Sequence, residues 1–259
     1  MLVQFLQQDI SADGVYDFDP TLGDLKVQRF NEDTLDDSFS QIAATISGKI
    51  GSTQFLYTGA ILDREVRQNA DYSGFAGKNG IYVPYYTCNH PLYTSCDDSS
   101  IFFQGVVDSK RNTHEIRVAT DGQKKYVFTG GIFFDASKSE NQENFNYPGY
   151  SPSFALNSPI STARSINSSA RLPGVLEFSD ITREQSQTAL FGELTFRILP
   201  EKFHLMLGGR FYQQTVDFYG SSNNPTSGSA DADDGIDFDS SFGHSKEKLE
   251  ENDSIYKVT

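Results

Sequence analysis

Long apolar runs, clustered basic residues and cysteines are all scarce in this chain of 259 residues. No apolar run approaches the ~20 residues that a transmembrane helix needs, which excludes a helical membrane protein. The net charge is −14, whereas nucleic-acid binding needs clustered lysine and arginine, so no nucleic-acid partner is expected. No basic, apolar, small-residue secretion signal opens the chain; residues 1–9 resemble a strand already under way.

Cys88 and Cys96 are the two cysteines, and they lie eight residues apart in YYTCNHPLYTSCDD. Proline, asparagine, aspartate and serine mark this stretch as a turn-rich surface segment, which favours a local disulfide over two unrelated thiols. A metal site built from Cys88, His90 and Cys96 lacks a fourth ligand at a recognised spacing, so no metal is expected there.

Acidic residues are concentrated in two segments, 9–37 and 231–253, which each hold nine of the 35. Glycine, serine and asparagine accompany them, and this composition predicts solvated loops. The stretch DADDGIDFD at 231–239 is rich in the oxygen ligands that Ca²⁺ prefers. It fails the EF-hand register, because alanines fall at ligand positions, and a flexible acidic loop is favoured over a calcium site.

Apolar and polar residues alternate with period two in three pairs of runs, which predicts three β-hairpins. The paired runs are 39–49 with 53–66, 112–120 with 124–135, and 189–198 with 203–212. Half-strands at 2–8 and 254–259 bring the total to about eight strands of roughly 10–14 residues, with no convincing helix.

Short and long connections alternate along the chain. The short ones fall at 50–52, 121–123 and 199–202, and the long ones at about 10–38, 67–111, 136–186 and 218–253. Loops this long are uncommon in a compact soluble domain, and strict alternation places all of them at one end of the sheet. Outer-membrane barrels have this asymmetry, with short periplasmic turns and long extracellular loops. We therefore expect an all-β fold: an antiparallel transmembrane β-barrel portion.

The two faces of the predicted sheet differ in polarity. Aliphatic and aromatic side chains share one parity and are expected to face lipid, among them Leu190, Leu194, Phe196, Leu205 and Leu207. Charged side chains take the other parity and are expected to face a polar lumen, namely Glu115, Arg117, Glu193, Arg197 and Arg210. His114 falls on the apolar face beside Ile116, where a packing role is favoured over catalysis. The four histidines and the serines show no defensible catalytic spacing, so no enzyme and no cofactor are expected.

Several stretches resemble TonB-dependent outer-membrane receptors. NTHEIRVATDGQKKYVFTGGIFFD and TALFGELTFRILPEKFHLMLGGRFY are similar to strand–turn–strand units of that family's barrel. TQFLYTGAILDREVRQNADYSGF resembles an earlier barrel strand, and ENDSIYKVT resembles the entry to a following one. The order and spacing of these motifs carry the resemblance over most of the chain, apart from the loops.

The resemblance implies that residues 1–259 are one incomplete barrel domain, an internal fragment of a receptor whose plug domain and remaining strands lie elsewhere. Such receptors take up a scarce large solute, such as an iron chelate, cobalamin or a glycan fragment. The implied partners are outer-membrane lipid, the small-molecule or glycan ligand, and the TonB energy-transducing complex acting through the plug. The implied location is the cell outer membrane.

Two alternatives remain open. Eight strands can close into a self-contained small outer-membrane barrel with a structural or adhesive role. A soluble, secreted acidic β-sandwich that binds a glycan or a protein would show the same alternation, with its charged face in water.

Overall fold

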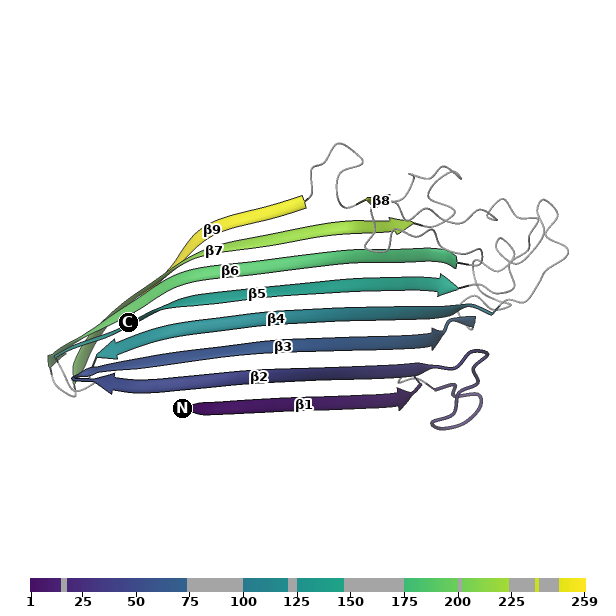
Figure 1. Cartoon of the computed structure of the whole chain (residues 1–259), viewed down its shortest axis with the longest axis horizontal. Coiled ribbons are helices and arrows are strands. Elements are labelled where there is room, and N and C mark those ends of the chain that lie inside the picture. Colours follow the sequence, from purple (N-terminus) through teal and green to yellow (C-terminus); the bar gives the residue numbers. More distant parts are fainter. Residues whose placement is uncertain are drawn as a thin grey trace.

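The protein folds as one antiparallel β-sheet (Figure 1). The computed structural model describes residues 1–14, 18–73, 100–120, 125–146, 175–199, 202–223, 236–237 and 247–259. The strands are β1 (Leu2–Asp13), β2 (Thr34–Ile50), β3 (Thr53–Asp71), β4 (Phe102–Thr120), β5 (Tyr126–Asn146), β6 (Val175–Leu199), β7 (Phe203–Asn223), β8 (Ile236–Asp237) and β9 (Glu247–Val258). The all-β prediction, with eight long antiparallel strands in one sheet, is confirmed.

Neighbouring strands follow sequence order from β1 to β7, and both β8 and β9 pair with the remaining edge of β7. The connections between β2 and β3, β4 and β5, and β6 and β7 are short and gather at one end, where the two chain ends also lie (Figure 1). The long connections 14–33, 72–101, 147–174 and 224–246 start and finish at the other end. At the first tight turn Gly51 has a φ of 59°, a left-handed conformation that glycine adopts without steric cost.

The predicted boundaries of the long loops were wrong, because the strands reach much further. The hairpin strands β2 to β7 contain 17 to 25 residues, and they include segments such as 136–146 that were expected to be loop. In the extension of β5 both faces are mostly polar, ASKSENQENFN at 136–146, so the alternation that marks a half-buried strand disappears. Pairing with the neighbouring strands maintains the extended structure there.

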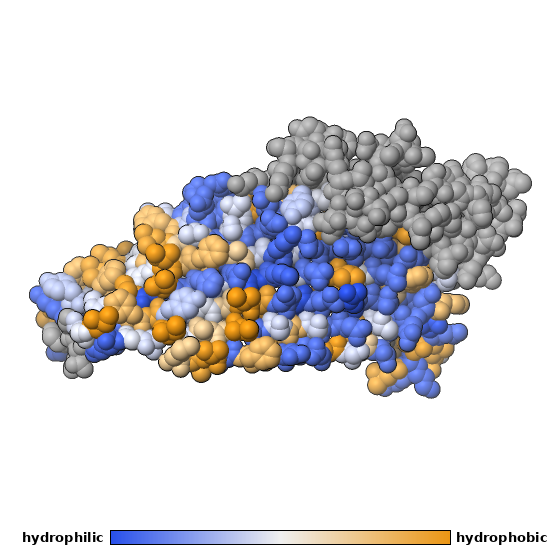
Figure 2. All heavy atoms as spheres, in the orientation of Figure 1, coloured by the Kyte–Doolittle hydropathy of each residue, from blue (hydrophilic) through white to orange (hydrophobic). Residues whose placement is uncertain are grey.

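Large apolar side chains cover one face of the sheet over the half nearest the tight turns. We call these residues the apolar band: Phe5, Ile42, Ile46, Phe55, Ile61, Ile116, Phe128, Ile132, Phe134, Leu190, Leu207 and Phe211. The strand register places all of them on the same face, and each is 40–64% exposed. Figure 2 shows apolar residues gathered over this half and hydrophilic residues over the half toward the long connections. Among the described residues only Ala70, Ile101, Phe178 and Ala189 are buried hydrophobic residues, so the sheet has almost no internal core.

The long connection 14–33 is held against the end of β3 through Asp71. Its carboxylate accepts hydrogen bonds from the backbone N–H of Phe30 (2.8 Å), from the side chain of Asn31 (3.3 Å) and from the N–H of Ser73 (3.0 Å). Burial raises the pKa of Asp71, but the hydrogen bond from the Ser73 hydroxyl, together with the three above, outweighs it and holds the pKa below its ordinary value. Phe30 and Asn31 of this connection are therefore fixed to the end of β3.

Strands β4, β5 and β6 approach closely at Gly131. A β-carbon at this position would collide with the backbone oxygen of Ile116, and it would lie 2.7 Å from the ring of Phe191. The neighbouring Gly192 is in a looser place, since a β-carbon there would meet its nearest atom, in Phe128, at 3.6 Å. The absence of a side chain at Gly131 is what lets the Phe191 ring lie across β5.

We expect Gly131→Ala to lower the free energy of unfolding by about 2 kcal/mol, because a strand backbone cannot move aside as a flexible side chain does. Gly192→Ala is the matched control and should change it by less than about 0.5 kcal/mol. Urea unfolding followed by circular dichroism measures both. Equal stabilities of the two variants would contradict the close approach.

Candidate functional site: the charged face of the sheet

The five polar residues predicted to face a lumen all lie on the side of the sheet opposite the apolar band. Glu115 and Arg117 come from β4, Glu193 and Arg197 from β6, and Arg210 from β7. Antiparallel register carries them to one face, because partners across a strand pair share a face. That this face lines a lumen stays a prediction. We call the side chains of Glu115, Arg117, Phe133, Phe191, Glu193, Arg210 and Lys257 the charged face.

One register row runs across four strands of the charged face. Arg117 lies opposite Gly131, Gly131 opposite Phe191, and Phe191 opposite Arg210. The guanidinium of Arg117 reaches across the glycine and lies 5.6 Å from the centre of the Phe191 ring. The guanidinium of Arg210 lies 5.1 Å from the ring centre of Phe133. Both arginines therefore rest on aromatic rings within cation–π distance.

Carboxylates and an amide orient the cations of the charged face. Arg117 Nη2 lies 2.6 Å from Glu115 Oε1, and Lys257 Nζ lies 3.4 Å from Glu193 Oε2. These ion pairs are partly exposed, so each adds little stability and mainly fixes side-chain direction. Arg210 Nη2 donates a hydrogen bond of 2.8 Å to the side-chain oxygen of Gln187.

Toward the long connections, two bidentate pairs continue the charged face. Arg64 donates to both carboxylate oxygens of Asp37, at 2.9 and 2.6 Å, and Arg111 donates to both oxygens of Asp135, at 2.8 and 3.2 Å. The hydrogen bonds from Arg64 lower the pKa of Asp37. Bidentate pairing fixes the orientation of these four charged side chains on the face.

Of the five predicted residues, only Arg117 and Arg210 belong to the register row described above. Arg197 lies closer to the tight turn, opposite His204. Phe133, Phe191 and Lys257 belong to the charged face but were not predicted to, and neither was the role of Gly131 in the register row. The available signal was the presence of Phe191 and Phe133 among polar residues of the same parity, together with the glycine pair at 130–131.

His114 lies on the face of the apolar band. Its Nδ1 is 2.9 Å from the hydroxyl of Tyr57, and its ring stacks against those of Tyr57 and Phe134. These are packing and hydrogen-bonding contacts. Cys88 and Cys96 lie outside the described residues, as does most of the acidic loop 231–239, so the disulfide and the calcium question stay predictions.

Within the described part of the chain, no group of three or more histidine, cysteine, aspartate or glutamate side chains can hold a metal ion. The same residues contain no helix with the length and apolarity to cross a membrane. The charged face offers hydrogen-bond donors, fixed positive charge and aromatic rings. These groups can recognise a polar or anionic surface.

Comparison with solved structures finds the ferric yersiniabactin uptake receptor FyuA from Yersinia pestis, with a TM-score of 0.55 and 9% sequence identity. The match covers 88% of this chain and 26% of that receptor, so this chain spans about a quarter of the receptor's length. At this identity the likeness shows the fold alone. No family model matches the chain, and no curated protein matches it.

The contact between Arg210 and Phe133 should be measurable in a double-mutant cycle. Combining Arg210→Gln with Phe133→Leu is expected to give a coupling free energy of about 0.5–1 kcal/mol, because the cation loses its aromatic partner. Arg197→Gln with Phe133→Leu is the control cycle, and distant sites should add within about 0.3 kcal/mol. Urea unfolding of the variants provides the values. Equal coupling in both cycles would contradict a specific stack.

Proposed function

We propose that this chain forms part of the wall of a TonB-dependent outer-membrane receptor that takes up a scarce large solute. The observation that carries the proposal is the apolar band, an exposed apolar surface on one face of a sheet with almost no internal core. The structural likeness to part of an uptake receptor supports the same conclusion. In this arrangement the apolar band faces hydrocarbon and the charged face lines the lumen.

The edge of the apolar band supports a tilted, membrane-crossing sheet. The register row through Phe5 of β1 reaches Glu250 on β9. On β9 the apolar residue of the same face that lies nearest the long connections is Tyr256, six residues from Glu250 toward the tight turns. Six residues span about 20 Å, and seven strand-to-strand steps span about 34 Å. The edge is therefore inclined by about 30° to the register rows, close to the 35–45° tilt of membrane barrels.

The height of the apolar band also suits a bilayer. On β5 the outward apolar residues run from Tyr126 to Phe134, which is nine residues. At about 3.3 Å per residue and the tilt above, the band is about 25 Å tall. Membrane strands need about 9–11 residues, and the outward apolar band of barrels is about 25 Å tall.

The long connections then lie on the extracellular side and the tight turns on the periplasmic side. An iron chelate, cobalamin or a glycan fragment remains the class of solute, and TonB would act through a plug domain that packs against the charged face. A soluble β-sandwich would instead bury the apolar band against a second sheet, and a small barrel would pair β1 with β9.

Site-directed spin labelling tests the orientation. In a Cys88→Ser/Cys96→Ser background, nitroxides at Glu115→Cys, Ile116→Cys, Arg117→Cys and Val118→Cys sample both faces of β4 in turn. In bilayers, we expect labels at 116 and 118 to be accessible to lipid-soluble oxygen, and those at 115 and 117 to an aqueous nickel chelate. The inverse pattern, or no preference for oxygen at any site, would rule out a lipid-facing apolar band.

Transport is tested in cells that carry the full-length protein. Uptake of a panel of labelled ferric chelates, cobalamin and oligosaccharides should include one solute whose accumulation stops when the gene is deleted. Accumulation of that solute should also stop when the inner-membrane proton gradient is collapsed, while a small sugar that diffuses passively serves as the control. Uptake unchanged by deletion for the whole panel would argue against a receptor of this kind.

A further inference from the structure

The first long connection, described over residues 18–33, exposes its large apolar side chains instead of burying them. We call these five residues the exposed patch: Phe18, Leu22, Leu25, Val27 and Phe30. The exposed fractions of Leu25 and Phe30 are 86% and 74%. Figure 2 shows apolar residues at the lower right of the molecule, where Figure 1 places this connection. Single exposed apolar residues are ordinary on a protein surface, but five in one short connection are typical of an interaction site.

Hydrogen bonds order this connection although its apolar side chains are exposed. The N–H of Asp19 donates to the carbonyl of Lys26 at 2.7 Å, which closes a turn that carries Leu22 and Leu25. Farther along, the Asp33 carboxylate accepts hydrogen bonds from the N–H of Asp71 at the end of β3 and from a nearby arginine, each at 2.5 Å. The backbone of the exposed patch is thus ordered before any partner binds, which lowers the entropic cost of association.

Leu25 occupies an unfavourable backbone conformation. Its φ is 55°, in the left-handed region that leucine rarely adopts and that glycine or asparagine adopts more readily. The side chain is almost fully exposed, so burial within the chain does little to offset the strain. Strained backbone is concentrated where a protein contacts its ligands and partners. The conformation of Leu25 therefore points to a contact with another molecule.

The exposed patch lies too far from the apolar band for lipid chains to cover it. Phe30 is bonded to Asp71 at the end of β3, whereas the residue of the apolar band nearest to Asp71 on that strand is Ile61. The strand from Ile61 to Asp71 spans about 33 Å, while the headgroup layer outside the hydrocarbon is only about 5–8 Å thick.

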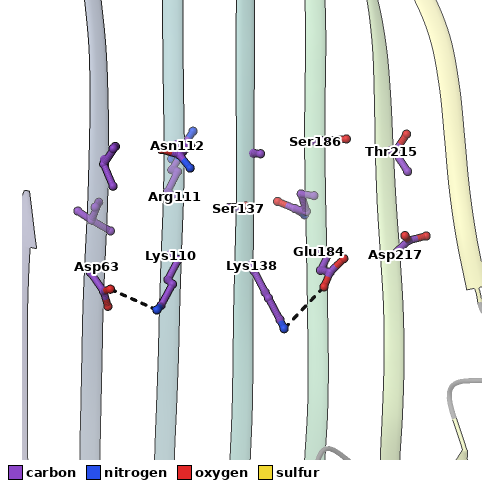
Figure 3. A pocket seen from close by; sticks show the side chains of 14 residues that line it. Asp63, Lys110, Arg111, Asn112, Ser137, Lys138, Glu184, Ser186, Thr215 and Asp217 are labelled. Atoms are coloured by element: carbon purple, nitrogen blue, oxygen red, sulfur yellow. Dashed lines mark ion pairs between the residues drawn. The ribbon is translucent and has the colours of Figure 1, made fainter. Parts of the chain in front are cut away.

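Charged side chains occupy the same face of the sheet just beyond the apolar band. Figure 3 shows this region, where Lys110 pairs with Asp63 at 3.5 Å and Lys138 with Glu184 at 3.8 Å. Lys138 Nζ also lies 2.8 Å from Glu140. The ion pairs separate the apolar band from the first connection, so the exposed patch is a second apolar surface and not a continuation of the band.

The segment around the exposed patch is strongly acidic. Residues 9–37 carry nine acidic side chains and two basic ones, and one of the two, Arg29, is paired with Asp33. Asp24 and Glu32 are exposed beside the patch. Like-charge repulsion opposes a second copy of this chain, whose net charge is −14. An apolar contact surrounded by lysine and arginine is what complements this surface.

We propose that the first connection is a docking surface for a basic protein on the extracellular side. Leu25 and Phe30 are its apolar anchors, and Asp24 and Glu32 face lysine and arginine side chains of the partner. The inference rests on the proposed function for the side of the membrane on which the connection lies.

Cysteine labelling of the full-length protein establishes the position of the exposed patch, in a Cys88→Ser/Cys96→Ser background. Gln104→Cys, an exposed position at the same end of the sheet, should react with a membrane-impermeant maleimide in intact cells. Reaction only after lysis would contradict the proposed function itself. Leu25→Cys in the purified protein should react as readily as Gln104→Cys. A much slower reaction would show that the receptor's own chain covers Leu25, which would overturn only the docking surface.

Photo-crosslinking in cells that carry the full-length protein identifies the partner. Benzoylphenylalanine is placed at position 25, at position 30 and, as the control, at position 104. We expect positions 25 and 30 to give the same crosslinked polypeptide, one with a basic surface, and position 104 not to give it. Crosslinks to lipid or polysaccharide, crosslinks within the receptor alone, or no product would each overturn the proposal.

Peptide binding measures the chemistry of the surface on the full-length protein in phosphatidylcholine nanodiscs. The probes are a synthetic lysine–leucine peptide and two controls, a glutamate–leucine and a lysine–serine peptide, followed by fluorescence anisotropy against empty nanodiscs. The lysine–leucine peptide should bind most tightly. Asp24→Asn/Glu32→Gln should weaken its binding about three-fold at low salt and less at high salt, because the charges are exposed.

Leu25→Asn/Phe30→Asn separates docking from folding. Asparagine tolerates the left-handed conformation and both backbone N–H groups remain, so the free energy of unfolding should not fall. Binding of the lysine–leucine peptide should weaken at least about ten-fold, because two apolar anchors are lost. Leu249→Asn, at another exposed leucine, is the matched control and should leave binding unchanged. Equal binding of the three peptides, or equal losses in the double variant and the control, would overturn the proposal.

Discussion

A single constraint organises this molecule: one face of a sheet that is one layer thick carries a continuous band of exposed, large apolar side chains. Antiparallel pairing satisfies the backbone hydrogen bonds from strand to strand, but it buries little apolar surface. Each exposed Å² of such surface costs about 25 cal/mol in water, and the apolar band joins residues from seven strands. The fold therefore requires a cover for that face, and under the proposed function hydrocarbon of about the same thickness as the band is that cover.

The opposite face is built as a consequence of the same register. Once the apolar side chains occupy one parity, charged residues and a few aromatic rings share the other. Gly131 then decides how these groups meet, because it leaves room for the Phe191 ring to lie across β5 and for Arg117 to reach that ring. The cations of the charged face thus contact aromatic rings and carboxylates, and these contacts restrict the orientations of the arginine and lysine side chains.

Beyond the apolar band the sheet carries more polar side chains on both faces. Ion pairs and hydrogen bonds join neighbouring strands there, as in the pair of Arg64 with Asp37, beside ring contacts such as that of Phe103 with Phe145. This extension carries the long connections away from the apolar band and holds the first of them through Asp71. It also forms a groove at the boundary where apolar and polar parts of one face meet, lined by Ile61, Asp63, Lys110 and Glu184.

The sequence by itself determined the hairpins, the two faces and the end at which the long connections gather. Period-two alternation and tight-turn residues are local signals, so the face of Leu190 or Arg117 follows from a few neighbours. It did not determine the true strand ends, because segments such as 136–146 are polar on both faces and carry no alternation. Only the tertiary structure decided which residues meet across strands, such as Arg117, Gly131, Phe191 and Arg210, or Lys110 and Lys138. These cross-strand contacts depend on the register between strands whose residues lie up to tens of positions apart in the sequence. That register is set by the pairing of the whole sheet rather than by any one strand.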